Sequence, residues 1–164
     1  KNVKNLIIAS ALSIMAASCY AGSLVPNTST GVSADVNFSN PGQLQARLTP
    51  VSGLVAGPHK ADEAIAVLSV SGSSKQYAVT GDYSKPEVVG NASDVWTVTG
   101  KNGNTIKVNF GGVGCGNKGS LVDGASHKWW VYNMADKVAV KLSGSQTVKA
   151  DTYPVTLNIA EYQA

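Results

Sequence analysis

The sequence is poor in charge, histidine and cysteine, and each shortage argues against a class of protein. Only 14% of its 164 residues are charged, and no Lys/Arg cluster is interleaved with aromatic residues, so no nucleic-acid partner is expected. The two histidines, His59 and His127, have no other metal ligands at short spacing, which predicts no metal or cofactor. No nucleophile-elbow or phosphate-loop motif appears, so the sequence does not predict an enzyme. A Ser-His-Asp triad assembled from distant positions is not tested by spacing alone.

The first 21 residues have the order of a secretory signal. Lys1 and Lys4 precede an apolar run at 6–17, and small residues follow up to Ala21. The run is shorter than the roughly 20 residues that a membrane-spanning helix needs. We therefore expect export with cleavage after Ala21, and lipidation at Cys19 is the alternative.

Removal of residues 1–21 leaves Cys115 as the only cysteine. A disulfide within one exported chain is then excluded, and Cys115 is either buried and inert or a reactive thiol. The loss of Lys1 and Lys4 lowers the Lys+Arg count from 13 to 11 against 10 Asp+Glu, a net charge of +1. Such a balance provides no attraction for polyanions.

Short strand-like segments recur along the rest of the chain, with no helical period between them. Gly100–Asn104 contains an Asn-Gly pair that favours a tight turn, so 95–110 is predicted to be one hairpin. This spacing is typical of an all-β, immunoglobulin-like sandwich. The predicted strands are 44–48, 63–70, 76–80, 95–99, 105–110, 128–132, 138–142 and 153–162.

The two ends of the exported chain carry complementary patterns. At 32–39 an apolar residue occurs at every second position, and an Asn-Pro-Gly break follows; the apolar side chains are Val32, Ala34, Val36 and Phe38. A second alternating segment at 153–162 is not followed by another strand; its apolar side chains on one face are Tyr153, Val155, Leu157 and Ile159.

A sandwich that lacks its last strand leaves an apolar groove and two open edges. The first segment of a second copy could fill the groove of this one, which is donor-strand exchange. The pattern alone leaves a second interpretation open: 32–39 could be the first strand of its own closed, monomeric domain, a secreted or lipid-anchored binding module.

Several segments closely resemble the Saf-type atypical fimbrial subunit, a member of the chaperone-usher pilins that use chaperones with a long F1–G1 loop. They are Gly22-Ser-Leu-Val-Pro-Asn27, Asp35-Val-Asn-Phe-Ser-Asn-Pro41, Leu48-Thr-Pro-Val-Ser-Gly-Leu-Val-Ala-Gly57 and Ala150-Asp-Thr-Tyr-Pro-Val-Thr-Leu157. The resemblance covers both ends of the chain and is weak between 71 and 136.

The resemblance implies an incomplete immunoglobulin-like sandwich completed by a neighbouring subunit, with 1–21 as signal peptide, 22–40 as donor extension and 41–164 as pilin domain. It implies that Val32, Ala34, Val36 and Phe38 are donated, with Phe38 as the bulky anchor, and that 153–159 forms one side of the acceptor groove. A periplasmic chaperone, an outer-membrane usher and identical subunits are the implied partners. The implied product is a cell-surface fimbrium with this chain as its major subunit, contributing to host attachment or biofilm.

Aromatic residues are concentrated at 129–132. Trp129 and Trp130 are adjacent, so one indole points to each face of a strand, and Tyr132 and Tyr83 could join the one near solvent. Core packing is one interpretation, and contact with a host receptor, a carbohydrate or a protein, is the other.

Overall fold

The computed structural model describes residues 22–29, 31, 33–34, 36, 38, 40, 42–88 and 94–164. The predicted signal peptide therefore lies outside the described residues. The chain divides into two units, Lys1–Asn37 and Phe38–Ala164. The described positions of the first unit carry no strand or helix, and their side chains are exposed.

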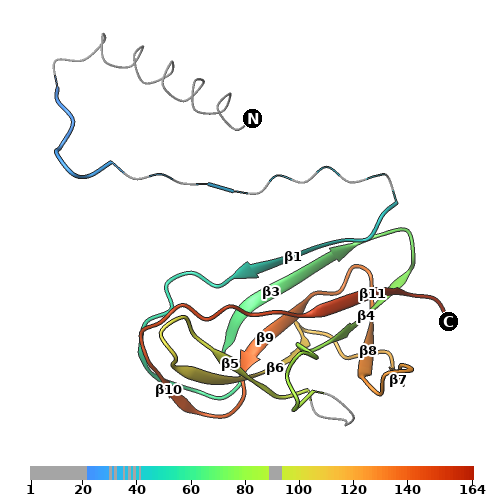
Figure 1. Ribbon diagram of the computed structural model, residues 1–164. Coiled ribbons are helices and arrows are strands. Elements are labelled where there is room, and N and C mark those ends of the chain that lie inside the picture. Colours follow the sequence, from blue (N-terminus) through green and yellow to red (C-terminus); the bar gives the residue numbers. More distant parts are fainter. Residues whose placement is uncertain are drawn as a thin grey trace. The chain divides into compact units, whose positions relative to one another are not determined.

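The second unit is built only of strands over its described residues (Figure 1). One sheet has five strands in the order β1-β3-β9-β6-β5, another has four in the order β11-β4-β8-β7, and β10 pairs with β2. All pairs are antiparallel. The strands are β1 Gln45–Pro50, β2 Gly57–His59, β3 Ala64–Ser71, β4 Gln76–Thr80, β5 Trp96–Thr99, β6 Thr105–Gly112, β7 Ser120–Val122, β8 Lys128–Asn133, β9 Val138–Leu142, β10 Gln146–Val148 and β11 Asn158–Tyr162.

One hydrophobic core lies between the two larger sheets. Alternate residues of β6 point into it, as the period of a strand requires, whereas consecutive residues of β4 and β9 are buried. In β6, for example, Ile106, Val108 and Phe110 are buried, and Tyr77 and Val79 of β4 join them from the other sheet. The all-β immunoglobulin-like sandwich predicted from the sequence is confirmed.

The sequence did not predict three of the strands. Strands β2, β7 and β10 have three residues each and no apolar alternation. Pairing stabilises them: β10 lies along β2, and β7 lies along β8. The predicted strand 153–162 is a laddered strand only over Asn158–Tyr162.

The predicted β5–β6 hairpin is present, with Thr99 opposite Thr105 and a positive φ of 87° at Gly103. The carboxylate of Asp151 accepts hydrogen bonds from the backbone N–H of Asn102 at 3.0 Å and from the side-chain amide of Asn104 at 3.1 Å. It thereby holds the hairpin turn against the segment that leads into β11.

We predict that Asp151→Asn lowers the thermal midpoint of unfolding at neutral pH. Desolvation raises the pKa of Asp151, but the hydrogen bonds from Asn102, Thr152 and Asn104 outweigh it, and the net pKa is lowered. The stabilisation is therefore present above the unfolded-state pKa of about 3.9 and is lost as the pH falls through the lower folded value.

Thermal unfolding at a series of pH values measures this effect. Asp62→Asn is the matched control, because Asp62 is exposed and asparagine tolerates its positive φ of 65°. If the two variants had the same thermal midpoint of unfolding at every pH, the Asp151 carboxylate would not stabilise the hairpin.

Candidate functional site

Residues 153–157, just before β11, alternate between half-buried and exposed as a strand does, but they pair with no neighbouring strand in the described part of the chain. Tyr153, Val155 and Leu157 are half-buried and pack against the core, while Pro154 and Thr156 between them are exposed. No backbone hydrogen bond links 153–157 to any residue among 42–88 and 94–164. The backbone polar groups on this edge are thus available to another strand.

An open groove of about 510 Å³ lies between this segment and β1. Leu48 of β1 and Ile65 of β3 line it from the five-stranded sheet, and Tyr153 and Val155 line it from the other side. Strand β1 pairs with β3 alone in the described part of the chain, so its outer edge borders the groove unpaired. The groove therefore combines apolar walls with two open backbone edges.

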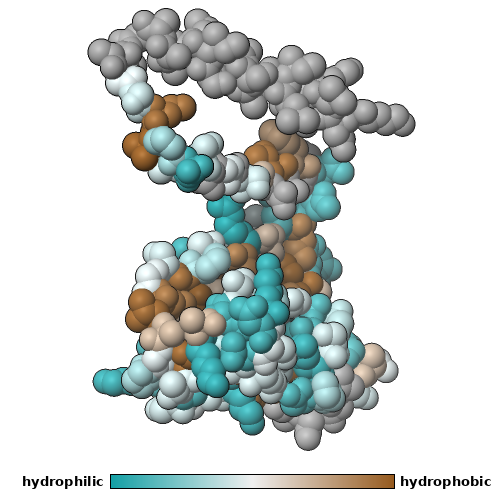
Figure 2. All heavy atoms as spheres, turned by 60° about the vertical axis from the view of Figure 1, so that its left-hand side comes forward, coloured by the Kyte–Doolittle hydropathy of each residue, from teal (hydrophilic) through white to brown (hydrophobic). Residues whose placement is uncertain are grey.

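The loop between β1 and β2 contributes to the lining of the groove. Val51, Leu54 and Val55 belong to the groove lining, and all three are exposed large hydrophobic residues. Figure 2 shows hydrophobic residues gathered in patches among hydrophilic ones on the face that it presents. Exposed apolar side chains beside an apolar groove are typical of a surface that receives a partner.

His59 holds this loop in place. Its Nδ1 lies 2.7 Å from the Glu63 carboxylate, and its Nε2 lies 2.7 Å from the carbonyl oxygen of Val55. Both partners are acceptors, so both ring nitrogens must carry hydrogen for both bonds to form. The hydrogen bond to Val55 and then that to Glu63 raise the pKa of His59 above its ordinary value.

Of the four predicted groove residues, Tyr153 and Val155 line the groove, whereas Leu157 and Ile159 are not among its lining residues and pack partly buried against the core. Sequence analysis did not find Leu48, Ile65 and His59 as groove residues. Leu48 and Ile65 fall inside predicted strands, so their strand register could have suggested them. Nothing local to His59 indicates its bond to Val55.

The predicted donor residues are not in the core of their own domain where the structure describes them. Val36 is 76% exposed and Phe38 is 95% exposed, and neither lies in a strand. Ala34 is also exposed, and Val32 lies outside the described residues.

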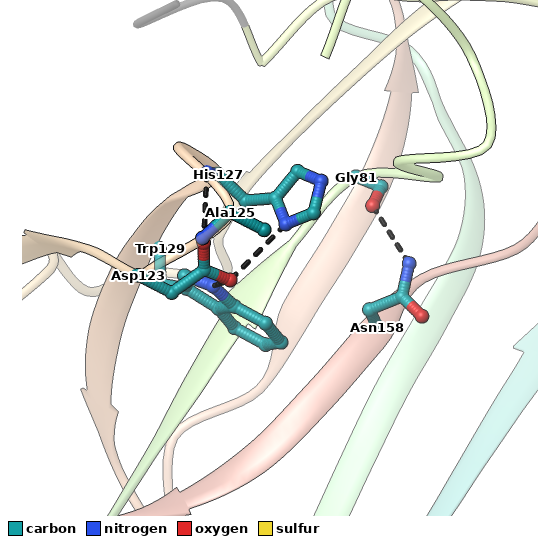
Figure 3. A network of polar contacts seen from close by, with 6 residues as sticks. All are labelled: Gly81, Asp123, Ala125, His127, Trp129 and Asn158. Carbon is teal, nitrogen blue, oxygen red and sulfur yellow. Dashed lines mark hydrogen bonds and ion pairs between the residues drawn. The ribbon is translucent and has the colours of Figure 1, made fainter. Parts of the chain in front are cut away.

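The adjacent tryptophans point to opposite faces of β8, as predicted. Trp130 packs against the core, with its ring edge-on to Phe110 at a centroid distance of 5.4 Å. Trp129 donates from Nε1 to the Asp123 carboxylate at 2.9 Å, and His127 reaches the same carboxylate at 3.1 Å (Figure 3). Both indoles are half-buried.

Tyr132, the third candidate receptor contact, is 3% exposed and stacks on Tyr77. Little of its side chain is available to a large receptor. Tyr83, also named in the sequence analysis, is exposed and lies 6.2 Å from Trp129 between ring centroids, with its ring stacked on His127 at 4.3 Å. The carboxylate of Asp123 accepts four hydrogen bonds, from Ala125, Trp129 and the backbone and ring of His127, which fix this cluster.

Among the described residues, no group of three or more His, Cys, Asp and Glu is placed to hold a metal ion. No helix in that part of the chain is long and apolar enough to cross a membrane.

Several solved structures of fimbrial and adhesin proteins share the fold of this sandwich. The Salmonella SafD adhesin has 24% sequence identity and a TM-score of 0.55, with 71% of this chain and 82% of that chain covered. The E. coli Hda pilus minor tip subunit HdaB has 11% identity and a TM-score of 0.53, with coverage of 71% and 80%. A structure reported for fibronectin binding and biofilm formation by enteroaggregative E. coli AAF fimbriae has 12% identity and a TM-score of 0.53, with coverage of 71% and 86%. At these identities the likeness concerns the fold.

The sequence family described as Saf-pilin pilus formation protein matches residues 22–164. The chain belongs to this family, so the resemblance seen in the sequence is confirmed. No curated protein matches the chain in sequence. Membership identifies the chain as a fimbrial subunit and not an enzyme, in agreement with the sequence prediction.

We predict that the loop at 51–56 is held more firmly at low pH than at high pH. The folded-state pKa of His59 is raised, so its contribution to stability is full below the unfolded-state value of about 6.5 and is lost as the pH rises through the folded value. His59→Gln should remove this dependence, and Glu63→Gln should weaken it.

Amide hydrogen exchange of residues 51–56 at pH 6 and pH 8 measures the effect. The wild type should exchange more slowly at pH 6 after correction for intrinsic rates, and His59→Gln should show no such difference. If the exchange rates of residues 51–56 differed between pH 6 and pH 8 by the same amount in both proteins, His59 would not be the group that holds the loop.

Proposed function

We propose that this chain is a shaft subunit that polymerises by donor-strand exchange. Residues 22–40 of one copy provide the donor, and the groove between β1 and 153–159 of the next copy accepts it. The observation that carries the proposal is the open apolar groove, whose two bordering edges have no ladder partner in the described part of the chain.

The groove and the donor match in chemistry. The groove presents half-buried apolar side chains from both walls, and the donor presents Val36 and Phe38 almost fully exposed. Burial of each of these two side chains is worth about 1.5–3 kcal/mol. An inserted strand would also pair with backbone groups of β1 and 153–157. It would therefore bury the apolar surface and pair both open edges at the same time.

Shape also favours Phe38 as the anchor. Leu48, Ile65, Tyr153 and Val155 line the groove, and Phe38 is the largest side chain of the donor segment. An aromatic ring fills such a hollow with more contact area than valine does. The remaining donor residues, Val32, Ala34 and Val36, would occupy further positions along the groove.

The proposed partners follow from the exposed groove. An open edge and an apolar cleft aggregate unless they are covered, so a periplasmic chaperone would occupy the groove until an usher exchanges it for the next subunit. The fibre would then lie on the cell surface. An adhesive role is consistent with the fibronectin binding and biofilm formation named for the AAF fimbriae, and here it would act through repeated copies along the shaft.

We predict that Phe38→Ala weakens the fibre by about 1.5–3 kcal/mol per subunit junction, roughly a 10- to 150-fold loss in junction affinity. The measurement is the denaturant concentration at which assembled fibres dissociate. Leu24→Ala is the matched control, because Leu24 is as exposed as Phe38 and lies in the extension ahead of the alternating segment 32–39.

If fibres of both variants dissociated at the same denaturant concentration, the role of Phe38 as the anchor of the donor strand would be contradicted. A wild-type protein that stays monomeric with its groove closed by its own 32–39 segment would contradict donor-strand exchange itself.

A further inference from the structure

The proposed donor extension carries a single charged side chain. Among residues 22–40 it is Asp35, which lies between the apolar residues Ala34 and Val36. Successive side chains of a strand point to opposite faces. When donor-strand exchange places Val36 and Phe38 in the groove, Asp35 therefore points to the outer face of the sheet that the donor joins.

The sheet beside which the donor would insert carries only positive charge. Its strands β1, β3, β9, β6 and β5 contain three charged residues, Arg47, Lys107 and Lys141, and no Asp or Glu. Leu48 packs against the core, so its neighbour Arg47 points to the outer face, where it is exposed. Arg47 and Asp35 thus have opposite charges and belong to the same face of two strands that would be adjacent.

Arg47 has no ionic partner within the described part of its own chain, where both ion pairs involve a histidine. The residue opposite Arg47 on β3 is Ser69, which is uncharged. A carboxylate brought to the outer edge of β1 therefore has no existing partner of Arg47 to displace.

The apolar hollow lies at one end of the groove. Strand β1 lines it with Leu48 and Pro50 but not with 45–47. With Phe38 in this hollow, the preceding residues 32–37 extend either along β1 towards its first residue or beyond its other end.

The last segment of the chain runs along the same path as β1. Tyr162 of β11 pairs with Gln76 of β4, and Gln45 of β1 pairs with Ser71 of β3, so only the short connection 72–75 separates their two partners. The open edges of β1 and of the last segment therefore extend from the hollow towards the same end. A donor that runs in this direction pairs with both edges, whereas one that runs the other way passes the end of β1, so the donor lies parallel to β1.

This direction brings Asp35 beside Arg47. Asp35 precedes Phe38 by three residues. Arg47 likewise precedes Pro50 by three, so the charged pair is level when Phe38 is level with Pro50. When Phe38 is level with Leu48, the pair is offset by two residues, a diagonal that long side chains still span.

Apolar alternation does not distinguish these two registers, because a shift of two residues keeps the same side chains facing the groove. Opposite charges do distinguish them, since the attraction is strongest when the two side chains are level.

We infer that Asp35 of the inserted donor strand forms an ion pair with Arg47 of the accepting subunit at each junction, and that this pair selects the register of the donor. The inference rests on the proposed donor-strand exchange. It adds a recognition contact on the outer face of the sheet, away from the apolar groove. A donor without a carboxylate at this position would fill the same groove but would leave Arg47 unpaired.

Urea dissociation of fibres assembled from the full chain tests the pair, because urea is uncharged and does not screen it. Asp35→Arg and Arg47→Asp each place two like charges at every junction, and each should lower the junction affinity about three- to tenfold at low salt. The double variant restores the pair in reverse, so its affinity should return to within about twofold of the wild type. In about 1 M NaCl these differences should shrink, since salt screens exposed charges.

Lys107→Asp is the matched control for the change in net charge. Lys107 is exposed on the same face of the sheet, but β3 and β9 separate its strand from β1. Lys149→Asp is the control for direction, because Lys149 lines the hollow that would hold Phe38, and a donor running the other way would carry Asp35 beyond that end. Fibres of both control variants should dissociate at the same urea concentration as wild-type fibres.

The inference is overturned if Asp35→Arg and Arg47→Asp dissociate like Lys107→Asp, or if the double variant is no more resistant to urea than either single variant. It is also overturned if Lys149→Asp, in place of Arg47→Asp, restores the Asp35→Arg fibre. These outcomes leave donor-strand exchange standing, because the wild-type fibre still forms and Phe38→Ala tests the groove separately. A wild-type chain that forms no fibre would overturn the inference together with the proposed function.

Discussion

Unpaired strand edges beside half-buried apolar side chains are the constraint on which the account of this subunit depends. Backbone groups on the outer edge of β1 and along 153–157 have no ladder partner in the described chain, and Leu48, Val155 and Leu157 are only partly covered. Such an arrangement is stable only when something supplies both a strand and apolar side chains. Assembly would then complete the folding of each subunit.

The alternation of apolar residues was enough to predict the main strands, the hairpin at Gly103 and the opposed faces of Trp129 and Trp130, because these features arise from the two-residue period of a strand. Strands β2 and β10 could not be predicted, since they are stabilised by each other across the fold. For the same reason the sequence did not reveal that His59 bonds to Val55.

The position of Phe38 in the assembled fibre tests the central claim most directly. A photo-crosslinking amino acid placed at position 38, followed by mass spectrometry of the linked peptides, identifies what surrounds it. The account predicts links to Leu48, Ile65, Tyr153 or Val155 of a different copy of the chain. Links to the core of the same copy, or none to any groove residue, would contradict it.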